Sequence, residues 1–243
     1  MNRTGPSLAV LSDRITATFL ERPNKYLGIV ELEGKRLEAF IPNPGRMLEL
    51  MVPGKRVLLR PARTSTRRKT RFDLVAVRYR GRFVLIDSGV PNRFLRYLLA
   101  QDLLPELKGW KLLRSEFRWG NSRFDFLLGR GRRRCLLEAK CSTLVTRDSP
   151  GQLREARFPD APTLRGTRHV RELIEAGREG YRTVLLFMVQ GVGAELFRAN
   201  RKTDPLFSET LREAAESGVE TYARVIRFAG KKVYLESSLP VEV

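Results

Sequence analysis

Hydrophobic and polar residues alternate along much of the first 88 residues. This period of two is typical of β-strands that bury one face. Short runs of turn-forming residues, such as Arg22–Lys25 and Glu33–Lys35, separate the alternating stretches. The pattern predicts strands at Ile15–Glu21, Tyr26–Glu33, Arg36–Ile41, Arg56–Arg60, Phe72–Tyr79 and Phe83–Asp87.

A short helix is predicted at Pro44–Met51, between the third and fourth of these strands, because a proline is favoured at the start of a helix. Five or six short strands with one helix after the third is the plan of an OB-fold barrel. Such barrels often bind single strands or oligosaccharides. From the pattern alone, an unrelated small barrel or sandwich remains an alternative.

The rest of the chain alternates strands with helices, which indicates an α/β domain with a mixed sheet. A helix at Pro91–Leu104 connects the two halves, and we place the boundary between residues 88 and 89, giving domains 1–88 and 89–243. The predicted strands are Trp110–Arg118, Arg123–Leu128, Arg134–Cys141, Thr183–Gln190, Gly193–Arg198, Glu220–Arg227 and Lys232–Leu235, and the predicted helices are Arg165–Gly177 and Asp204–Ser217.

The composition adds a strong positive charge to this picture. The chain has 46 Lys+Arg against 27 Asp+Glu, a net charge of +19. Arginine binds phosphates through two parallel hydrogen bonds, so nucleic acid is the expected partner. An arginine-rich proteome or adaptation to heat is the alternative. No apolar run is long enough for a membrane span and no secretory signal is visible, so we expect no membrane association and a cytoplasmic location.

One predicted hairpin carries charged residues that an apolar strand does not need for its structure. If its turn is centred near Gly131 and Arg132, Asp125 lies opposite Glu138, and directly opposed residues point to one face. Lys140 shares that face because side chains alternate along a strand. Two carboxylates and an ammonium group should therefore meet there.

Such a set fits a divalent cation and a phosphate ester. Asp125 and Glu138, with the Ala139 carbonyl, would hold Mg²⁺ or Mn²⁺ through oxygen ligands, and Glu116 on the preceding strand is a candidate third carboxylate. The metal would activate water for attack on a phosphodiester, and Lys140 would orient that water or balance the developing charge. An ordinary polar strand with an exposed ion pair explains the same residues equally well.

Basic residues elsewhere are candidates for phosphate contacts. They lie in a tight turn, in a charged loop, beside Asp125 and at the start of a predicted helix. Charge runs of this kind are also common in solvated loops, and the single histidine is also consistent with simple packing. The candidates are Arg46, Arg67, Arg68, Lys69, Arg123, Arg165, Arg168 and His169.

Longer motifs run through nearly the whole chain. They are Ile41-Pro-Asn-Pro-Gly-Arg46, Arg68-Lys-Thr70, Pro91-Asn92, Ser122-Arg-Phe-Asp-Phe126, Glu138-Ala-Lys140 with Thr143, and Phe158-Pro-Asp-Ala-Pro-Thr-x-Arg-Gly-x-Arg-His169. By these motifs the sequence resembles the sugar fermentation stimulation protein A family.

The resemblance implies an N-terminal OB-fold and a C-terminal domain of the PD-(D/E)xK nuclease superfamily. It also implies DNA binding and a role linked to the regulation of sugar metabolism. By motif position, the acidic pair of the superfamily falls on Asp125 and Glu138 and its lysine on Lys140, while Phe124 replaces the proline before the first acid.

Three hypotheses about function follow. The first is a Mg²⁺- or Mn²⁺-dependent nuclease that acts on single- or double-stranded DNA. The second is a non-cleaving DNA-binding regulator on a nuclease-like scaffold. The third is an RNA-processing protein. The oligomeric state stays open, with a dimer as one alternative.

Overall fold

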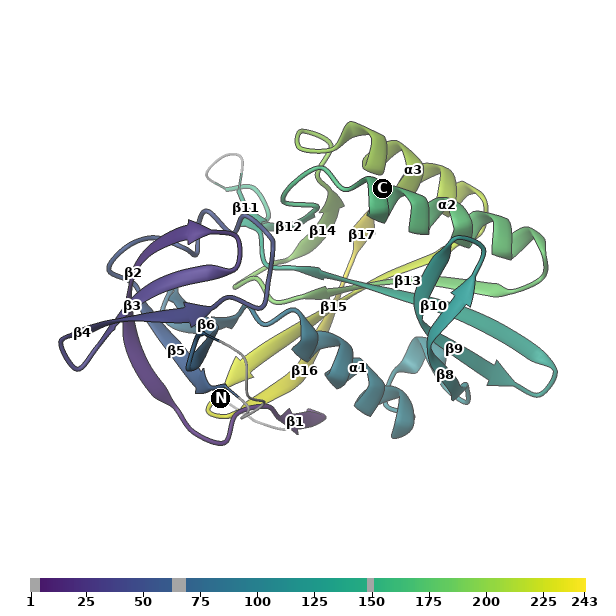
Figure 1. Cartoon of the computed structure of the whole chain (residues 1–243). Helices are drawn as coiled ribbons and strands as arrows, with labels where there is room; N and C mark the ends of the chain where they lie inside the picture. The colour runs from purple at the N-terminus through teal and green to yellow at the C-terminus, as the bar shows by residue number, and fades with distance from the viewer. Residues whose placement is uncertain (1–4, 63–68, 148–150) are drawn as a thin grey trace.

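The computed structural model describes residues 5–62, 69–147 and 151–243 (Figure 1). An N-terminal barrel packs beside a larger layered domain in which helices cover both faces of a sheet. No helix in these described ranges is both long enough and apolar enough to cross a membrane.

The barrel confirms the predicted OB-fold. The strands of its sheet pair in the order β4-β3-β2-β5-β6-β7, and an additional pairing of β4 with β6 closes the barrel. Phe19, Val30 and Val57 are at most 1% exposed and fill the interior. The strands are β2 Ile15–Asn24, β3 Leu27–Leu32, β4 Lys35–Phe40, β5 Arg56–Pro61, β6 Phe72–Tyr79 and β7 Arg82–Leu85.

The predicted helix at Pro44–Met51 was wrong. This segment is an irregular loop that ends in a single turn, in which the Met47 carbonyl accepts from the Leu50 and Met51 amides at 2.9 Å. The Arg22 guanidinium donates to the carbonyls of Asn43, Gly45 and Arg46, which are therefore not available for the hydrogen bonds of a helix. Met47 also has a φ of 47°, outside the right-handed helical region.

A seven-stranded mixed sheet forms the centre of the second domain, in the order β1-β16-β15-β13-β10-β9-β8. Helix α1 packs on one face, and helices α2 and α3 cover the other. Strands β10, β13 and β15 are parallel neighbours, and the remaining pairs are antiparallel. The elements are α1 Gly89–Ala100, η1 Pro105–Leu107, β8 Lys111–Trp119, β9 Ser122–Arg130, β10 Arg133–Ser142, α2 Leu164–Arg178, β13 Arg182–Val189, α3 Pro205–Glu216, β15 Glu220–Ala229 and β16 Lys232–Leu239.

Several short strands were not predicted. Strand β1 (Ser7–Ala9) precedes the barrel in the chain but pairs with β16 of the second sheet. A four-stranded sheet, β11-β12-β14-β17, lies beside the larger one. It contains β11 Val145–Thr146, β12 Glu155–Phe158, β14 Leu196–Ala199 and β17 Val241–Glu242. Of these four, only β14 overlaps a predicted strand, Gly193–Arg198. The predicted boundary at residues 88 and 89 falls between β7 and α1.

One apolar cluster joins the barrel to the second domain. Leu58 and Leu85 from the barrel, Phe94 from α1, and Ile226 and Phe228 from β15 all belong to it. Each of these side chains is at most 7% exposed, so the interface is a continuous core. This packing fixes the barrel against the sheet that carries the acidic hairpin.

Candidate functional site

The β9–β10 hairpin has the register that the sequence predicts. The paired residues run from Arg130 with Arg133 to Phe126 with Leu137. The turn between them contains Gly131, whose φ of 58° suits glycine. One further step along this register places Asp125 opposite Glu138.

At this end of the hairpin, hydrogen bonds that involve the side chains of Asp125 and Glu138 take the place of main-chain pairing. Its Oδ2 accepts a hydrogen bond from the Ala139 amide at 2.8 Å, and its own amide donates to Glu138 Oε2 at 3.3 Å. Its Oδ1 accepts from Asn92 Nδ2 of helix α1 at 2.7 Å. The two carboxylates are thus held side by side by neighbouring strands and by a helix from one face of the sheet.

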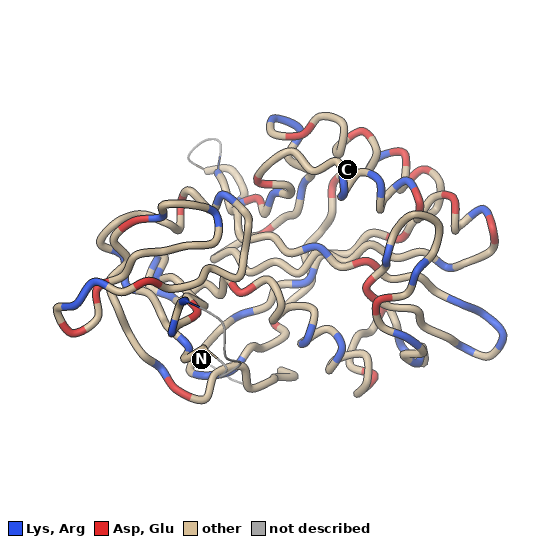
Figure 2. The backbone as a smooth tube through the Cα atoms, viewed as in Figure 1, with Lys and Arg blue, Asp and Glu red and all other residues tan. Residues whose placement is uncertain are grey.

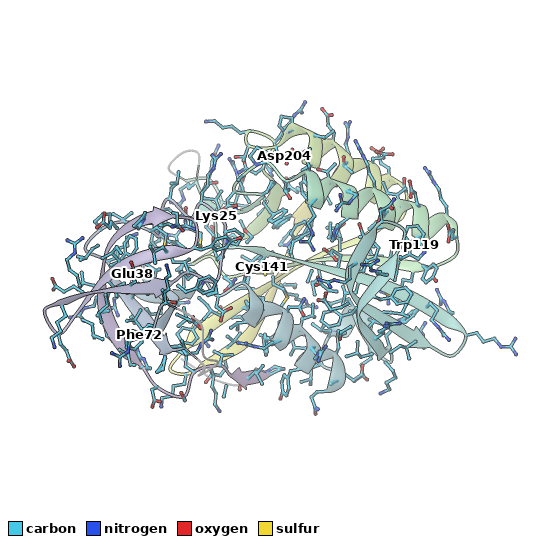
Figure 3. The ribbon with its side chains drawn as sticks, viewed as in Figure 1. Lys25, Glu38, Phe72, Trp119, Cys141 and Asp204 are labelled. Atoms are coloured by element: carbon cyan, nitrogen blue, oxygen red, sulfur yellow. The ribbon has the colours of Figure 1, made fainter. Side chains whose placement is uncertain are left out.

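Glu138 is 4% exposed and is surrounded by hydrogen-bond donors. Its Oε1 accepts from Lys140 Nζ and from His169 Nδ1, each at 2.6 Å. An unpaired carboxylate at this depth would be strongly disfavoured, so these donors are what keep Glu138 charged. The structure therefore brings together Asp125, Glu138 and Lys140 as predicted. Figure 3 labels Cys141, the residue that follows Lys140 on β10.

The two carboxyl groups differ in proton affinity. Burial, and then the charge of Glu138, raise the pKa of Asp125 to about 7. Burial acts to raise the pKa of Glu138 as well, but the His169 hydrogen bond and the Lys140 charge outweigh it and lower that pKa. Near neutral pH the pair shares between one and two negative charges, and a divalent cation would relieve the repulsion between them.

His169 was predicted as a nucleic-acid contact, and the structure corrects this. The side chain is 2% exposed, which leaves it no surface for a phosphate. Because Nδ1 donates to Glu138 and Nε2 accepts from Arg165 Nε at 3.4 Å, the two contacts define one tautomer. His169 therefore positions Glu138 from the side of the sheet that helix α2 covers. The ring of Phe124 packs against the His169 ring at 5.7 Å between centroids.

Two caps place His169 at this depth. Thr163 Oγ1 accepts from the Gly166 amide at 3.0 Å and caps helix α2. Asp204 caps helix α3 through the Phe207 amide at 3.0 Å, and its second oxygen accepts from the Thr163 amide at 2.8 Å. The starts of both helices are thus fixed to one another.

Glu116 does not join a preformed metal-binding group. It lies on β8 between Ser115 and Phe117, the partners of Phe126 and Phe124, and is therefore opposite Asp125. Its carboxylate pairs with Arg123 Nε at 2.7 Å and is more than half exposed. Within residues 5–62, 69–147 and 151–243, no three His, Cys, Asp or Glu side chains are arranged to hold a metal ion.

The donor set that remains still fits Mg²⁺ or Mn²⁺. Mg²⁺ is usually bound by one or two carboxylates together with water and substrate phosphates. Asp125 and Glu138 supply two carboxylates on adjacent strands, and their mutual repulsion is the electrostatic feature that a cation would remove. Mg²⁺ or Mn²⁺ binding itself stays a prediction.

The predicted phosphate contacts lie at different places around this site. Arg46, Lys69, Arg165 and Arg168 are exposed, and Arg123 is exposed but paired with Glu116. Arg67 and Arg68 lie outside the described residues. The loop that carries Arg46 contacts the second domain, because the Met47 amide donates to Asp160 Oδ2 at 3.3 Å.

Comparison with known proteins gives the family. Residues 20–86 match the family model described as the SfsA N-terminal OB domain, and residues 89–232 match the sugar fermentation stimulation protein RE domain. The chain belongs to the sugar fermentation stimulation protein family. A homologue of the sugar fermentation stimulation protein from Moorella thermoacetica is 46% identical over 210 residues, which cover 86% of this chain and 88% of that protein.

Other relatives agree in length and fold. The homologue from Methanothermobacter thermautotrophicus is 40% identical over 86% of this chain and 85% of its own. A solved structure of Pyrococcus furiosus SfsA, described as a complex with Ca²⁺, matches with a TM-score of 0.87 and 30% identity over 98% of this chain and 100% of that one. This chain therefore shares the two-domain fold of a solved family member.

The sequence assigns no role to two residues that make long-range contacts, Asn92 with the acidic pair and Asp160 with the loop that carries Arg46. Asn92 and Asp160 both lie within motifs that carry the family resemblance, but no local pattern indicates their contacts. Asn92 reaches Asp125 across 33 positions, and Asp160 reaches Met47 across 113. Such contacts depend on how distant elements pack.

Proposed function

We propose that this family member binds DNA and hydrolyses phosphodiester bonds at the Asp125–Glu138–Lys140 site with Mg²⁺ or Mn²⁺. The observation that carries the proposal is the pair of carboxylates held side by side at the end of the hairpin, with Lys140 Nζ 2.6 Å from Glu138. Burial and like charge raise the pKa of Asp125 to about 7, which marks a functional site more often than a purely structural one.

The relative from Pyrococcus furiosus supports the cation. Its structure is described in complex with Ca²⁺, and the two proteins are alike over nearly their whole length. Ca²⁺ and Mg²⁺ both prefer oxygen ligands, which are the donors that Asp125 and Glu138 provide. Ca²⁺ often occupies such sites without supporting the reaction, because it accepts looser geometry than Mg²⁺.

Each residue then has a defined task. Asp125 and Glu138 would hold the cation, which supplies Lewis-acid polarisation of water and phosphate when bound. Asn92 and His169 orient the two carboxylates from opposite sides. Lys140 orients the attacking water or balances charge on the phosphate, and the exposed Arg46, Arg165 and Arg168 hold neighbouring phosphates.

The experiment is a cleavage assay on single-stranded, duplex and branched DNA with Mg²⁺, Mn²⁺ or Ca²⁺. Asp125→Asn and Glu138→Gln keep the shape of each side chain and remove its charge. Glu213→Gln, an exposed carboxylate on helix α3, is the matched control. We expect cleavage that requires a divalent cation and is lost in both site variants only. Equal activity in all four proteins would refute the assignment.

A non-cleaving DNA-binding protein is the second candidate, and one observation favours it. At least one N–H donor already contacts every oxygen of the two carboxylates. A cation would have to share these oxygens or displace Lys140.

Calorimetric titration with Mn²⁺ separates the two candidates. Mn²⁺ binding that is lost in Asp125→Asn would favour the metal site. DNA binding without any Mn²⁺ binding would favour the regulator, and tighter binding to matched RNA than to DNA would favour the RNA hypothesis.

A further inference from the structure

A second concentration of positive charge lies at the other end of the same hairpin. Arg132 lies in the turn between β9 and β10, and Arg130, Arg133 and Arg134 lie at the strand ends beside it, so the hairpin forms a basic tip at one end of the molecule (Figure 2). Beside this tip is a cavity of about 360 Å³, which Arg130 and Arg133 line. The metal site proposed at Asp125 and Glu138 does not involve this cavity.

The acidic groups of the cavity are already neutralised. Glu220 accepts two hydrogen bonds from Arg182, each of 2.6 Å, and these contacts lower the pKa of Glu220. Glu106 pairs with Arg224, whose Nε lies 3.0 Å from Glu106 Oε1. The charge of Arg133 also acts on Glu220, but neither carboxylate accepts a hydrogen bond from Arg130 or Arg133 in the described residues.

Arg130 and Arg133 have no such partner in the part of the chain that the structure describes. No hydrogen bond or ion pair of their guanidinium groups occurs there. Their guanidinium carbons instead lie 5.2 and 5.9 Å from the ring centroid of the buried Trp110, and that of Arg182 lies 5.3 Å away. The aromatic face attracts each guanidinium group but uses none of its N–H donors. The N–H donors of both Arg130 and Arg133 therefore remain free.

This cavity is separate from the acidic site. Arg130 shares a strand face with Leu128, and Arg133 shares one with Cys135, and both of these residues pack in the α1-side core. Glu138 instead faces His169 on helix α2, on the opposite side of the sheet. Five residues along β9 separate Asp125 from Arg130, a distance of about 17 Å. One phosphate group therefore cannot reach both sites.

We propose that Arg130 and Arg133 form a second, metal-independent binding site for a phosphate group. Guanidinium forks bind phosphate oxygens in pairs, and two unpaired forks beside one cavity supply the donors that a phosphate requires. Lys108 also lines the cavity but is paired with Asp102 at 3.3 Å, so the proposal rests on the two arginines. The phosphate belongs either to the backbone of bound nucleic acid or to a free oligophosphate, and the two sources share this chemistry.

Trp110 provides a direct readout. The chain has two tryptophans, so in a Trp119→Phe background Trp110 reports alone. Inorganic pyrophosphate is titrated with EDTA present and ionic strength held constant with chloride. We expect a saturable change in Trp110 fluorescence. The absence of a saturable change would overturn the proposal.

A matched pair of double variants tests the residues. Arg130→Gln/Arg133→Gln removes the two forks, whereas Arg118→Gln/Arg132→Gln removes the same charge from exposed positions that do not line the cavity. We expect affinity for pyrophosphate to fall by about tenfold or more in the first variant only, since a bidentate charged pair is lost. Pyrophosphate should also raise the melting temperature of the control and not of the cavity variant. Equal loss in both would show diffuse charge and overturn the proposal.

Two further experiments show where the bound phosphate comes from and whether the site is independent of the acidic site. If duplex DNA displaces pyrophosphate, the phosphate is that of nucleic acid. If both bind together, it is that of a free oligophosphate. Asp125→Asn/Glu138→Gln should leave pyrophosphate binding unchanged, whatever the cleavage assay shows. Loss of binding in that variant would place the anion at the acidic site and refute a second one.

Discussion

At the scale of single residues, the site depends on how two buried carboxylates are kept apart in proton affinity. Glu138 stays charged because Lys140 and His169 donate to the same oxygen. Asp125 receives two neutral donors and no direct cation, and its pKa rises to about 7. The different hydrogen-bond partners of the two carboxylates therefore make Asp125 the one that binds a proton more readily.

This difference predicts a pH dependence of stability without metal. The folded pKa of Asp125 lies above its unfolded value near 3.8, so the folded protein binds more protons between these limits. The contribution of Asp125 to the free energy of unfolding therefore decreases as the pH rises from about 4 to about 7. Asp125→Asn should remove that part of the decrease, measured by urea unfolding across this range in EDTA. An unchanged pH profile in the variant would contradict the raised pKa.

His169 predicts a second effect at this scale. His169→Leu removes the donor to Glu138 and leaves a buried carboxylate with less compensation, so we expect a loss of about 1.5–3 kcal/mol in the free energy of unfolding. Arg168→Gln, at the adjacent exposed position of helix α2, should change it by less than about 0.5 kcal/mol. Urea unfolding of both variants checks this. Equal small effects would mean that His169 does not support Glu138.

The hairpin shows which part of the site the sequence can predict. Its register follows from a turn with Gly131 and from alternation along two strands, which are local properties. Asn92 and His169 come from two helices on opposite faces, and their contacts follow from tertiary packing that no local pattern contains. For the same reason the contact of His169 with Glu138 was not predicted.

At the scale of elements, long strands and capped helices were predictable, and short or tertiary-dependent ones were not. Asp204 before Pro205 predicts the start of α3, and the cap is present. Strands β11 and β17 have two residues each, too short for a periodic pattern to show. The segment after β4 contains helix-compatible residues, but Arg22 binds its carbonyls from a distant strand and prevents the helix.

The shared cap predicts coupling between helices α2 and α3. Asp204→Ala removes the cap of α3 and the acceptor of the Thr163 amide, and we expect a loss of about 2 kcal/mol or more, above a typical cap of about 1 kcal/mol. Thr163→Ala removes the α2 cap and keeps the Thr163 amide that Asp204 binds. A cycle of the two variants should give non-additive changes in the free energy of unfolding, because Asp204 positions the residue whose hydroxyl caps α2. Additive changes would show that the two caps act separately.

At the scale of the whole molecule, a net charge of +19 on a two-domain fold predicts binding to polyanions that weakens steeply with salt. Arg165→Gln/Arg168→Gln should reduce the slope of log K against log salt by about two, one for each lost phosphate contact. Arg178→Gln, at the other end of helix α2, serves as the control. Fluorescence anisotropy with labelled duplex and single-stranded DNA measures both. A slope equal to that of the wild type would remove the start of α2 from the binding surface.

Strand β1 has a consequence for how the protein can be divided. Residues 7–9 lie in the sheet of the second domain, the barrel follows, and the chain returns to that domain through α1, so the barrel is topologically an insertion. A fragment of residues 89–243 would lack β1 and would expose the free edge of β16, which is open to pairing with another copy. We expect that fragment to self-associate by light scattering, and a peptide of residues 5–12 to suppress the association. Removal of the barrel with a short loop between residues 12 and 89 should instead leave the sheet edge covered.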